Sequence, residues 1–205
     1  MKRRYFQIIE LLKEDKNISQ REVAKRLKIS LAYVNKILFS MEIDGFLKSN
    51  SAPFNLFKRE LTEKAIAEYD ACRVDNAIIM AAGFGSRFVP LTYATPKGLL
   101  EVFGERMIER QIKQLHEVGI TDITVVSPYL SIKYLKDTFE YLIDKYGVNL
   151  IFNPDYEEKN NLSTLYHARH LLKNTYILSS DNWMRENMYH SHEYDSWYAS
   201  IKVGE

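Results

Sequence analysis

Ala77-Ile78-Ile79-Met80-Ala81-Ala82-Gly83-Phe84-Gly85-Ser86-Arg87 is the stretch that decides the fold of the larger part of this 205-residue chain. Residues 77–81 form a continuous apolar run of strand length, and the glycines follow almost at once. Glycine lets a backbone come close to phosphate oxygens and point N–H groups at them. The stretch therefore predicts a buried strand that ends in a phosphate-binding loop, with a plain tight turn as the alternative.

Two common phosphate loops do not fit this segment. No Gly-Lys-Ser/Thr follows the glycines, which excludes a Walker loop, and Phe88 occupies the third glycine position of a dinucleotide fingerprint. Two cationic residues instead follow the glycines at a fixed distance in the sequence: Arg87, and Lys97 in Thr95-Pro96-Lys97. They suit a triphosphate, because they can neutralise the pyrophosphate that leaves when the α-phosphorus is attacked. A solvated surface position for Lys97 is the alternative.

Strand-like and helical patterns alternate after Asp75. Further strand-like runs cover 123–126, 148–152 and 176–179. Helical patterns lie between them at about 105–118, 131–145 and 162–172. The alternation predicts an α/β domain over residues 76–205 with a Rossmann-like, mostly parallel sheet.

Asp181 directly follows the fourth predicted strand. The carboxyl edge of an open α/β sheet is where ligands bind. Magnesium takes one or two carboxylates together with phosphate oxygens. Asp181 is therefore the expected Mg²⁺ ligand, and a plain turn at Asp181-Asn182 is the alternative.

Residues 1–72 show a different pattern, of short helices and one hairpin-like stretch. Ser19 and Glu22 form a capping box, and Ser30 is the expected N-cap of a third helix. Leu61-Thr62-Glu63-Lys64 begins a last helix. The pattern resembles the winged helix-turn-helix family, which implies a small, mainly α-helical N-terminal domain over residues 1–72.

The winged-helix resemblance implies DNA contacts from the third helix and the wing. The DNA-binding candidates are Tyr33, Asn35, Lys36, Lys48, Lys58 and Arg59. Residues 1–75 carry fifteen Lys and Arg against eleven Asp and Glu, a charge of +4 that is modest for DNA. A winged helix that binds protein or forms a homodimer is the alternative.

The bulk composition excludes several classes. With 46% hydrophobic residues the chain can bury a core, and no run approaches the roughly 20 apolar residues of a membrane span. Cys72 is the single cysteine, which excludes a disulfide framework and fits a cytoplasmic protein.

Residues 76–205 resemble the nucleotidyltransferases that activate phosphorylated small molecules with a nucleoside triphosphate, and among them the bacterial CTP:phosphocholine cytidylyltransferases. The resemblance rests on the glycine segment, Arg87 and Lys97, and it continues through three further strings: Phe152-Asn153, Asn160-Asn161 with Thr164-Leu165-Tyr166, and Ser180-Asp181-Asn182.

The resemblance implies a role for each matching residue. Arg87 and Lys97 would be catalytic. The implied nucleotide-binding residues are Ala82, Gly83, Gly85, Ser86, Arg87, Lys97 and Ser127. Asp181 would bind the Mg²⁺ cofactor. The candidates on the acceptor side are Asn153, Asn161 and Thr164.

The implied reaction transfers CMP from CTP to phosphocholine, giving CDP-choline and pyrophosphate. A sugar-1-phosphate acceptor, or another nucleoside triphosphate as donor, stays open, because the segment specifies the donor phosphates better than anything else. A nucleotide-sensing transcriptional regulator without turnover is the alternative from a different class. Members of the family continue well beyond Glu205, so we expect this chain to be part of a longer enzyme.

Overall fold

The computed structural model describes residues 1–49, 59–83, 89, 95–128, 138–156, 158–159, 161–198 and 200. The chain divides into two compact units: Met1–Arg73 with His192–Glu205, and Val74–Ser191. The predicted domains split near residues 72–76 and put the last residues in the second one. In the structure the chain returns to the first unit, where the Tyr194 hydroxyl donates to the Met1 carbonyl oxygen at 2.9 Å.

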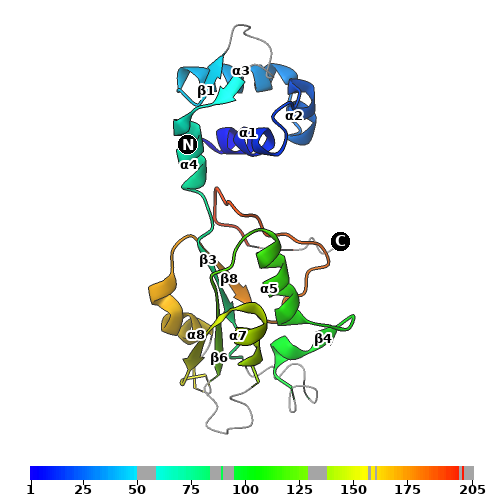
Figure 1. Ribbon diagram of the computed structural model, residues 1–205, viewed down its shortest axis with the longest axis vertical. Helices are drawn as coiled ribbons and strands as arrows, with labels where there is room; N and C mark the ends of the chain where they lie inside the picture. Colours follow the sequence, from blue (N-terminus) through cyan, green and yellow to red (C-terminus); the bar gives the residue numbers. More distant parts are fainter. Residues whose placement is uncertain are drawn as a thin grey trace. The chain divides into compact units, whose positions relative to one another are not determined.

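The described residues of the N-terminal unit form four helices and a two-stranded antiparallel sheet (Figure 1). The predicted cap at Ser19 is confirmed, since its hydroxyl accepts from the Glu22 N–H; Ser30 and Thr62 cap α3 and α4 in the same way. The elements are α1 (Arg3–Glu14), α2 (Gln20–Arg26), α3 (Leu31–Ile43), β1 (Leu47–Ser49), β2 (Arg59–Leu61) and α4 (Glu63–Asp70).

The core of this unit forms where the apolar stripes of its helices meet. The inner faces of α1 and α3 are fully buried at Ile8, Ile9, Leu38 and Met41. Phe6 stacks on Tyr69 of α4, with ring centroids 5.1 Å apart. Burial of these stripes, rather than helix propensity alone, holds such short helices in place.

The second unit is built on a four-stranded parallel sheet in the order β7-β6-β3-β8 (Figure 1). The strands are β3 (Asn76–Met80), β6 (Ile123–Pro128), β7 (Asn149–Asn153) and β8 (Thr175–Ser179). A small antiparallel hairpin, β4 (Glu101–Val102) with β5 (Glu105–Arg106), precedes the first long helix. The helices are α5 (Met107–Glu117), α7 (Tyr141–Tyr146), α8 (Asn161–Ala168) and the 3₁₀ turns η4 (Lys97–Leu99) and η5 (Arg169–Leu171).

Helices cover both faces of this sheet. On one face Ile79 and Val125 pack against Ile112 of α5 and Leu142 of α7. On the other face Ile78 and Val126 pack against Ala168 of α8. A sheet buried on both sides needs apolar residues at every strand position, and this is why residues 77–81 read as an unbroken apolar run. The predicted fold class is confirmed: an α/β domain with a parallel sheet and a small, mainly helical N-terminal unit.

Differences from the predicted elements are local. The helix expected over 105–118 begins at Met107, because residues 105–106 form the second strand of the hairpin. The helix expected over 131–145 is described only in its last part, as α7, since 129–137 lie outside the described residues. No described helix has the length and apolarity that a membrane crossing requires.

Candidate active site

Lys97 and Asp181 form an ion pair although 84 positions separate them in the chain. Lys97 begins the turn η4, and Asp181 comes two residues after the end of β8. The Lys97 ammonium contacts one carboxylate oxygen of Asp181, and the Ser179 hydroxyl donates to the other. Both side chains keep some contact with solvent, at 15% and 23% exposure, so a bound molecule can reach them.

A close approach of two backbones brings this pair together. A β-carbon on Gly98 would lie 2.8 Å from the Ser180 Cβ and 3.3 Å from the Ser180 carbonyl oxygen. Real side chains do not tolerate such distances, so glycine allows η4 to press against the turn that follows β8. Lys97 then reaches Asp181 from the neighbouring position.

Asp181 is held as an anion. Its burial raises the pKa of the carboxyl, but the hydrogen bonds from Lys97 and Ser179 outweigh that effect and leave the pKa below its usual value. The carboxylate therefore stays ionised at neutral pH and keeps its capacity to bind a cation.

Gln111 of α5 supports the turn that carries Asp181, a contact that sequence reasoning missed. Its side-chain amide nitrogen donates to the Ser179 carbonyl oxygen at 2.9 Å and to the Asn182 carbonyl oxygen at 2.6 Å. Gln111 is fully buried beside Ile112 on the inner face of α5. A polar residue on the apolar face of a helix was the available signal, because a buried amide requires partners.

The glycine segment begins at the same edge of the sheet. Met80 pairs with Ser179 in adjacent parallel strands, so the residues that follow both strands emerge side by side. Ala82 is buried and Gly83 is exposed at this edge. Three predicted nucleotide-binding residues, Gly85, Ser86 and Arg87, lie outside the described residues.

Ser127 is the remaining predicted nucleotide-binding residue. It lies near the carboxyl end of β6, opposite Phe152 of β7, and is buried with 2% exposure. The Ser127 side chain is therefore covered by neighbouring residues and does not face solvent in this structure.

The acceptor-side candidates separate into two buried residues and one exposed residue. The Asn153 side-chain amide donates to the Thr164 hydroxyl at 3.1 Å, and its oxygen accepts from the Asp155 N–H at 2.9 Å. Asn153 and Thr164 have 0% and 3% exposure, so in this structure they fasten α8 to the end of β7. Asn161, at the start of α8, is exposed.

The DNA-binding candidates are also distributed unevenly. Tyr33 and Lys36 are exposed on α3, and Asn35 between them is half-buried. Arg59 is buried and donates to Glu42 at 2.5 Å, which argues against a phosphate contact from this residue. Its pairing partner is 17 positions away, so the sequence pattern could not show this. Lys48 is exposed on β1, and Lys58 lies outside the described residues.

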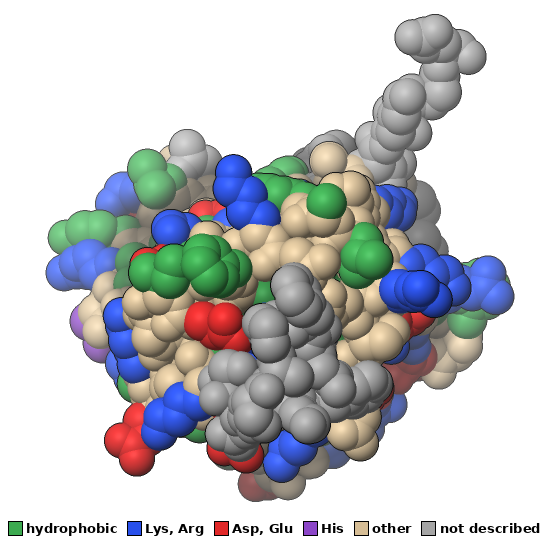
Figure 2. Space-filling view, turned by 90° about the horizontal axis from the view of Figure 1, so that it is seen from above, with side chains coloured by type: hydrophobic (Ala, Val, Ile, Leu, Met, Phe, Trp, Pro, Cys, Tyr) green, Lys and Arg blue, Asp and Glu red, His purple; other side chains and the backbone are tan. Residues whose placement is uncertain are grey.

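The face of the molecule drawn in Figure 2 is mixed in character. It shows Lys and Arg side chains spread among hydrophobic and other side chains. On α3, the hydrophobic side chains of Phe39 and Ile43 are 62% and 69% exposed. Such a surface fits a protein contact as well as a DNA contact.

Comparisons with known proteins agree with this geometry. Residues 76–199 match the family model described as nucleotidyl transferase, and residues 3–48 match the model described as winged helix-turn-helix DNA-binding. The choline-phosphate cytidylyltransferase of Streptococcus pneumoniae is 42% identical over 126 residues, which are 62% of this chain and 53% of that protein. The 2-aminoethylphosphonate cytidylyltransferase of Lancefieldella rimae is 46% identical over 109 residues, which are 52% of this chain and 42% of that protein.

A solved structure shows the same relationship in three dimensions. The CTP:phosphocholine cytidylyltransferase from Streptococcus pneumoniae superposes with a TM-score of 0.54 at 44% identity, covering 58% of this chain and 50% of that chain. This chain spans about half the length of the curated relatives it matches. The nucleotidyl transferase model covers more than half of the chain and includes both Lys97 and Asp181, so the chain belongs to the nucleotidyl transferase family.

Proposed function

We propose that this chain carries the donor half of a cytidylyltransferase site, which transfers CMP from CTP to a phosphorylated small molecule. The observation that carries the proposal is the meeting of Lys97 with Asp181 at the carboxyl edge of β3 and β8, where the glycine segment also begins. A cation, an anion and a glycine-rich backbone at one sheet edge are the groups that a metal-bound triphosphate requires.

The chemistry is an in-line displacement. A phosphate oxygen of the acceptor attacks the α-phosphorus of CTP, the bond from that phosphorus to the bridging oxygen of the β-phosphate breaks, and pyrophosphate leaves. Lys97 neutralises charge that builds up on the phosphates in the transition state, and Arg87 is proposed to act in the same way. The site positions the two reactants, and no covalent enzyme intermediate is needed.

Magnesium fits the groups present. Asp181 offers two ionised oxygens with partial solvent access, and Mg²⁺ accepts a single protein carboxylate when phosphate oxygens complete its shell. The described part of the chain has no cluster of three His, Cys, Asp or Glu side chains suited to a metal. When bound by Asp181, Mg²⁺ would supply charge neutralisation to the triphosphate.

We propose phosphocholine as the acceptor. It belongs to a wider class of possible acceptors, the small phosphates and phosphonates that carry an ammonium group. The relatives named above are a choline-phosphate and a 2-aminoethylphosphonate cytidylyltransferase, and both names join a phosphorus acid to a nitrogen cation, quaternary in choline and protonated in the aminoethyl group. A simple hexose-1-phosphate lacks such a cation. An acceptor panel therefore separates this proposal from the sugar-phosphate alternative.

The test is pyrophosphate release by the full-length protein with CTP, Mg²⁺ and each acceptor in turn. Lys97→Ala and Asp181→Ala are expected to lower turnover at least a hundredfold, and Lys173→Ala, an exposed lysine of the same unit, leaves it unchanged. Full turnover in both site variants would refute the assigned roles. Turnover only with sugar-1-phosphates would replace the acceptor class and keep the donor site.

The N-terminal unit is proposed to bind DNA through Tyr33 and Lys36 of α3, with support from the winged helix-turn-helix match. A gel-shift titration with and without CTP tests it and also examines the regulator alternative. CTP-sensitive DNA binding in a protein that releases no pyrophosphate would favour a nucleotide-sensing regulator over an enzyme.

A further inference from the structure

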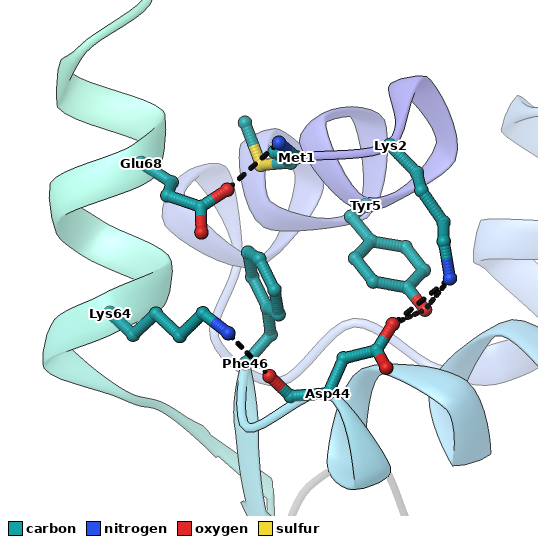
Figure 3. Close-up of a pocket in the computed structure, with 7 residues that line it drawn as sticks. All are labelled: Met1, Lys2, Tyr5, Asp44, Phe46, Lys64 and Glu68. Carbon is teal, nitrogen blue, oxygen red and sulfur yellow. Dashed lines mark hydrogen bonds and ion pairs between the residues drawn. The ribbon is translucent and has the colours of Figure 1, made fainter.

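The N-terminal unit has a pocket of about 380 Å³ to which no function has been assigned above (Figure 3). Its walls come from the start of α1, the turn that ends α3, the residue before β1, and α4. The residues that line it are Met1, Lys2, Tyr5, Asp44, Phe46, Lys64 and Glu68.

Two aromatic rings in the pocket already make cation–π contacts with lysine ammonium groups. The Lys64 Nζ lies over the Phe46 ring, 4.9 Å from its centroid, and the Lys2 Nζ lies 4.8 Å from the centroid of Tyr5. The two rings pack edge to face with centroids 5.2 Å apart, and in Figure 3 Phe46 lies between Lys64 and Tyr5. The negative face of an aromatic ring attracts such cations.

The oxygens around these rings also receive ammonium groups. Glu68 binds the Met1 α-ammonium at 2.9 Å, and the Asp44 carboxylate accepts from Lys2 at 2.9 Å and from the Tyr5 hydroxyl at 2.6 Å. The Asp44 backbone oxygen accepts from Lys64 at 2.8 Å. The hydrogen bonds from Tyr5 and Lys2 hold the pKa of Asp44 below its usual value, so this carboxylate is ionised at neutral pH.

We propose that the pocket binds a small ammonium compound, whose cationic group replaces the Lys64 ammonium over Phe46 and beside the Asp44 backbone oxygen. Lys64 is suited to yield, because its side chain is exposed and its ammonium is readily hydrated outside the pocket. Exchange of the Lys64 ammonium for another cation leaves the net charge of the pocket unchanged, and the Phe46 ring face favours a cation over a neutral molecule of the same shape.

This inference does not rest on the proposed transfer reaction. It gives the winged-helix unit a ligand class, a small ammonium compound. The pocket would let the N-terminal unit respond to the supply of such a compound whether or not the second unit is active.

Calorimetric titration of the 205-residue chain with choline and tetramethylammonium tests the proposal. Saturable binding of both is expected, without binding of the neutral isostere 3,3-dimethylbutan-1-ol. Lys64→Ala removes the competing ammonium and is expected to tighten choline binding about tenfold, the scale of one cation–π contact. Lys16→Ala, at an exposed lysine in the turn after α1, leaves the affinity unchanged.

Two further variants locate the site. Phe46→Leu keeps an apolar side chain but removes the ring, and it is expected to weaken choline binding about tenfold. Because Phe46 is buried and its loss can impair folding, the gain in Lys64→Ala is the decisive result: misfolding cannot tighten binding. Lys97→Ala is expected to keep the wild-type affinity.

Several results would overturn the inference. Absence of saturable choline binding would do so, as would unchanged or weaker binding in Lys64→Ala. Phosphate binding that disappears in Lys64→Ala would make the pocket an anion site. Loss of choline binding in Lys97→Ala would assign the compound to the candidate active site instead.

Discussion

Gly98 and Ser180 approach each other so closely that a β-carbon at position 98 would lie 2.8 Å from the Ser180 Cβ and 2.9 Å from its hydroxyl oxygen. The two residues stand next to Lys97 and Asp181, so their contact fixes how near the ammonium comes to the carboxylate. The spacing of the candidate catalytic pair thus depends on a residue that carries no functional group.

Gly98→Ala is therefore expected to impair the site more than the fold. The added methyl forces η4 away from the turn after β8 and separates Lys97 from Asp181. Overpacking of this kind costs about 1–3 kcal/mol of stability. Pyrophosphate release is expected to fall at least tenfold, and titration of the protein with CTP and Mg²⁺ is expected to show weaker binding. Wild-type kinetics in this variant would show that the spacing is not critical.

Gly83→Ala is the matched comparison for the fold. A β-carbon at Gly83 meets no described residue within 4 Å, so the free energy of unfolding is expected to stay within about 0.5 kcal/mol of the parent's. If Gly83→Ala unfolded as early as Gly98→Ala, a general intolerance of side chains in this region would explain both variants.

Gln111→Leu is expected to loosen the turn that holds Asp181. The substitution keeps the volume and removes the donor that the Ser179 and Asn182 carbonyl oxygens share. Leaving such buried acceptors without a partner costs about 1–3 kcal/mol. The concentration of Mg²⁺ needed for half-maximal turnover is expected to rise, because Asp181 is no longer positioned. Ile112→Leu, a neighbouring core change, controls for repacking of α5; a similar rise there would remove the special role of Gln111.

The sequence revealed the parts of this site that follow from local pattern. The buried strand before Gly83 shows as an apolar run, and the position of Asp181 follows from the end of a strand. Both are consequences of a sheet that is covered on two faces. The sequence also singled out Lys97 as a cation near the glycine segment, and the structure brings it to Asp181.

Contacts between distant positions could not be predicted in the same way. Gly98 reads as an ordinary residue after Lys97 until Ser180 is placed against it, and Gln111 reads as a polar interruption of a helix face. Arg59 is a basic residue of the predicted wing, yet in the structure it is buried and paired with Glu42. In each case the deciding partner comes from another element, and periodicity carries no information about it.

Thr164→Val tests whether the pair formed with Asn153 is structural. Valine keeps the shape of threonine but cannot accept from the buried Asn153 amide, so a loss of about 1–3 kcal/mol is expected in chemical unfolding. The KM for the acceptor is expected to stay the same, since both side chains are covered in this structure. Asn161→Ala, at an exposed position, is expected to leave stability unchanged. An increase in the acceptor KM of Thr164→Val without any loss of stability would restore Thr164 to the acceptor side.

Glu109 gives the second unit a defined sensitivity to acid. Its carboxylate accepts from the Tyr141 hydroxyl at 2.8 Å, the Lys145 ammonium at 2.7 Å and the Tyr146 hydroxyl at 2.6 Å, and these bonds join α5 to α7 and its end. Burial raises the pKa of Glu109, but the hydrogen bonds from Lys145, Tyr146 and Tyr141 outweigh it and lower the pKa to about 2. An unfolded glutamate titrates near 4.5, so the folded state binds its proton later than the unfolded state as the pH falls.

The stabilisation from Glu109 is therefore fully present above pH 4.5 and is lost as the pH falls toward about 2. We expect it to be about 2 kcal/mol, after allowance for solvent screening at the exposed Lys145. In Glu109→Gln, stability at pH 7 should fall by about that amount, and its decline between pH 4.5 and pH 2 should become shallower than in the parent. Denaturant unfolding across this range measures both effects, with Glu101→Gln, an exposed glutamate, as the control. Parallel declines in the parent and in Glu109→Gln would mean that other carboxylates govern acid unfolding of this unit.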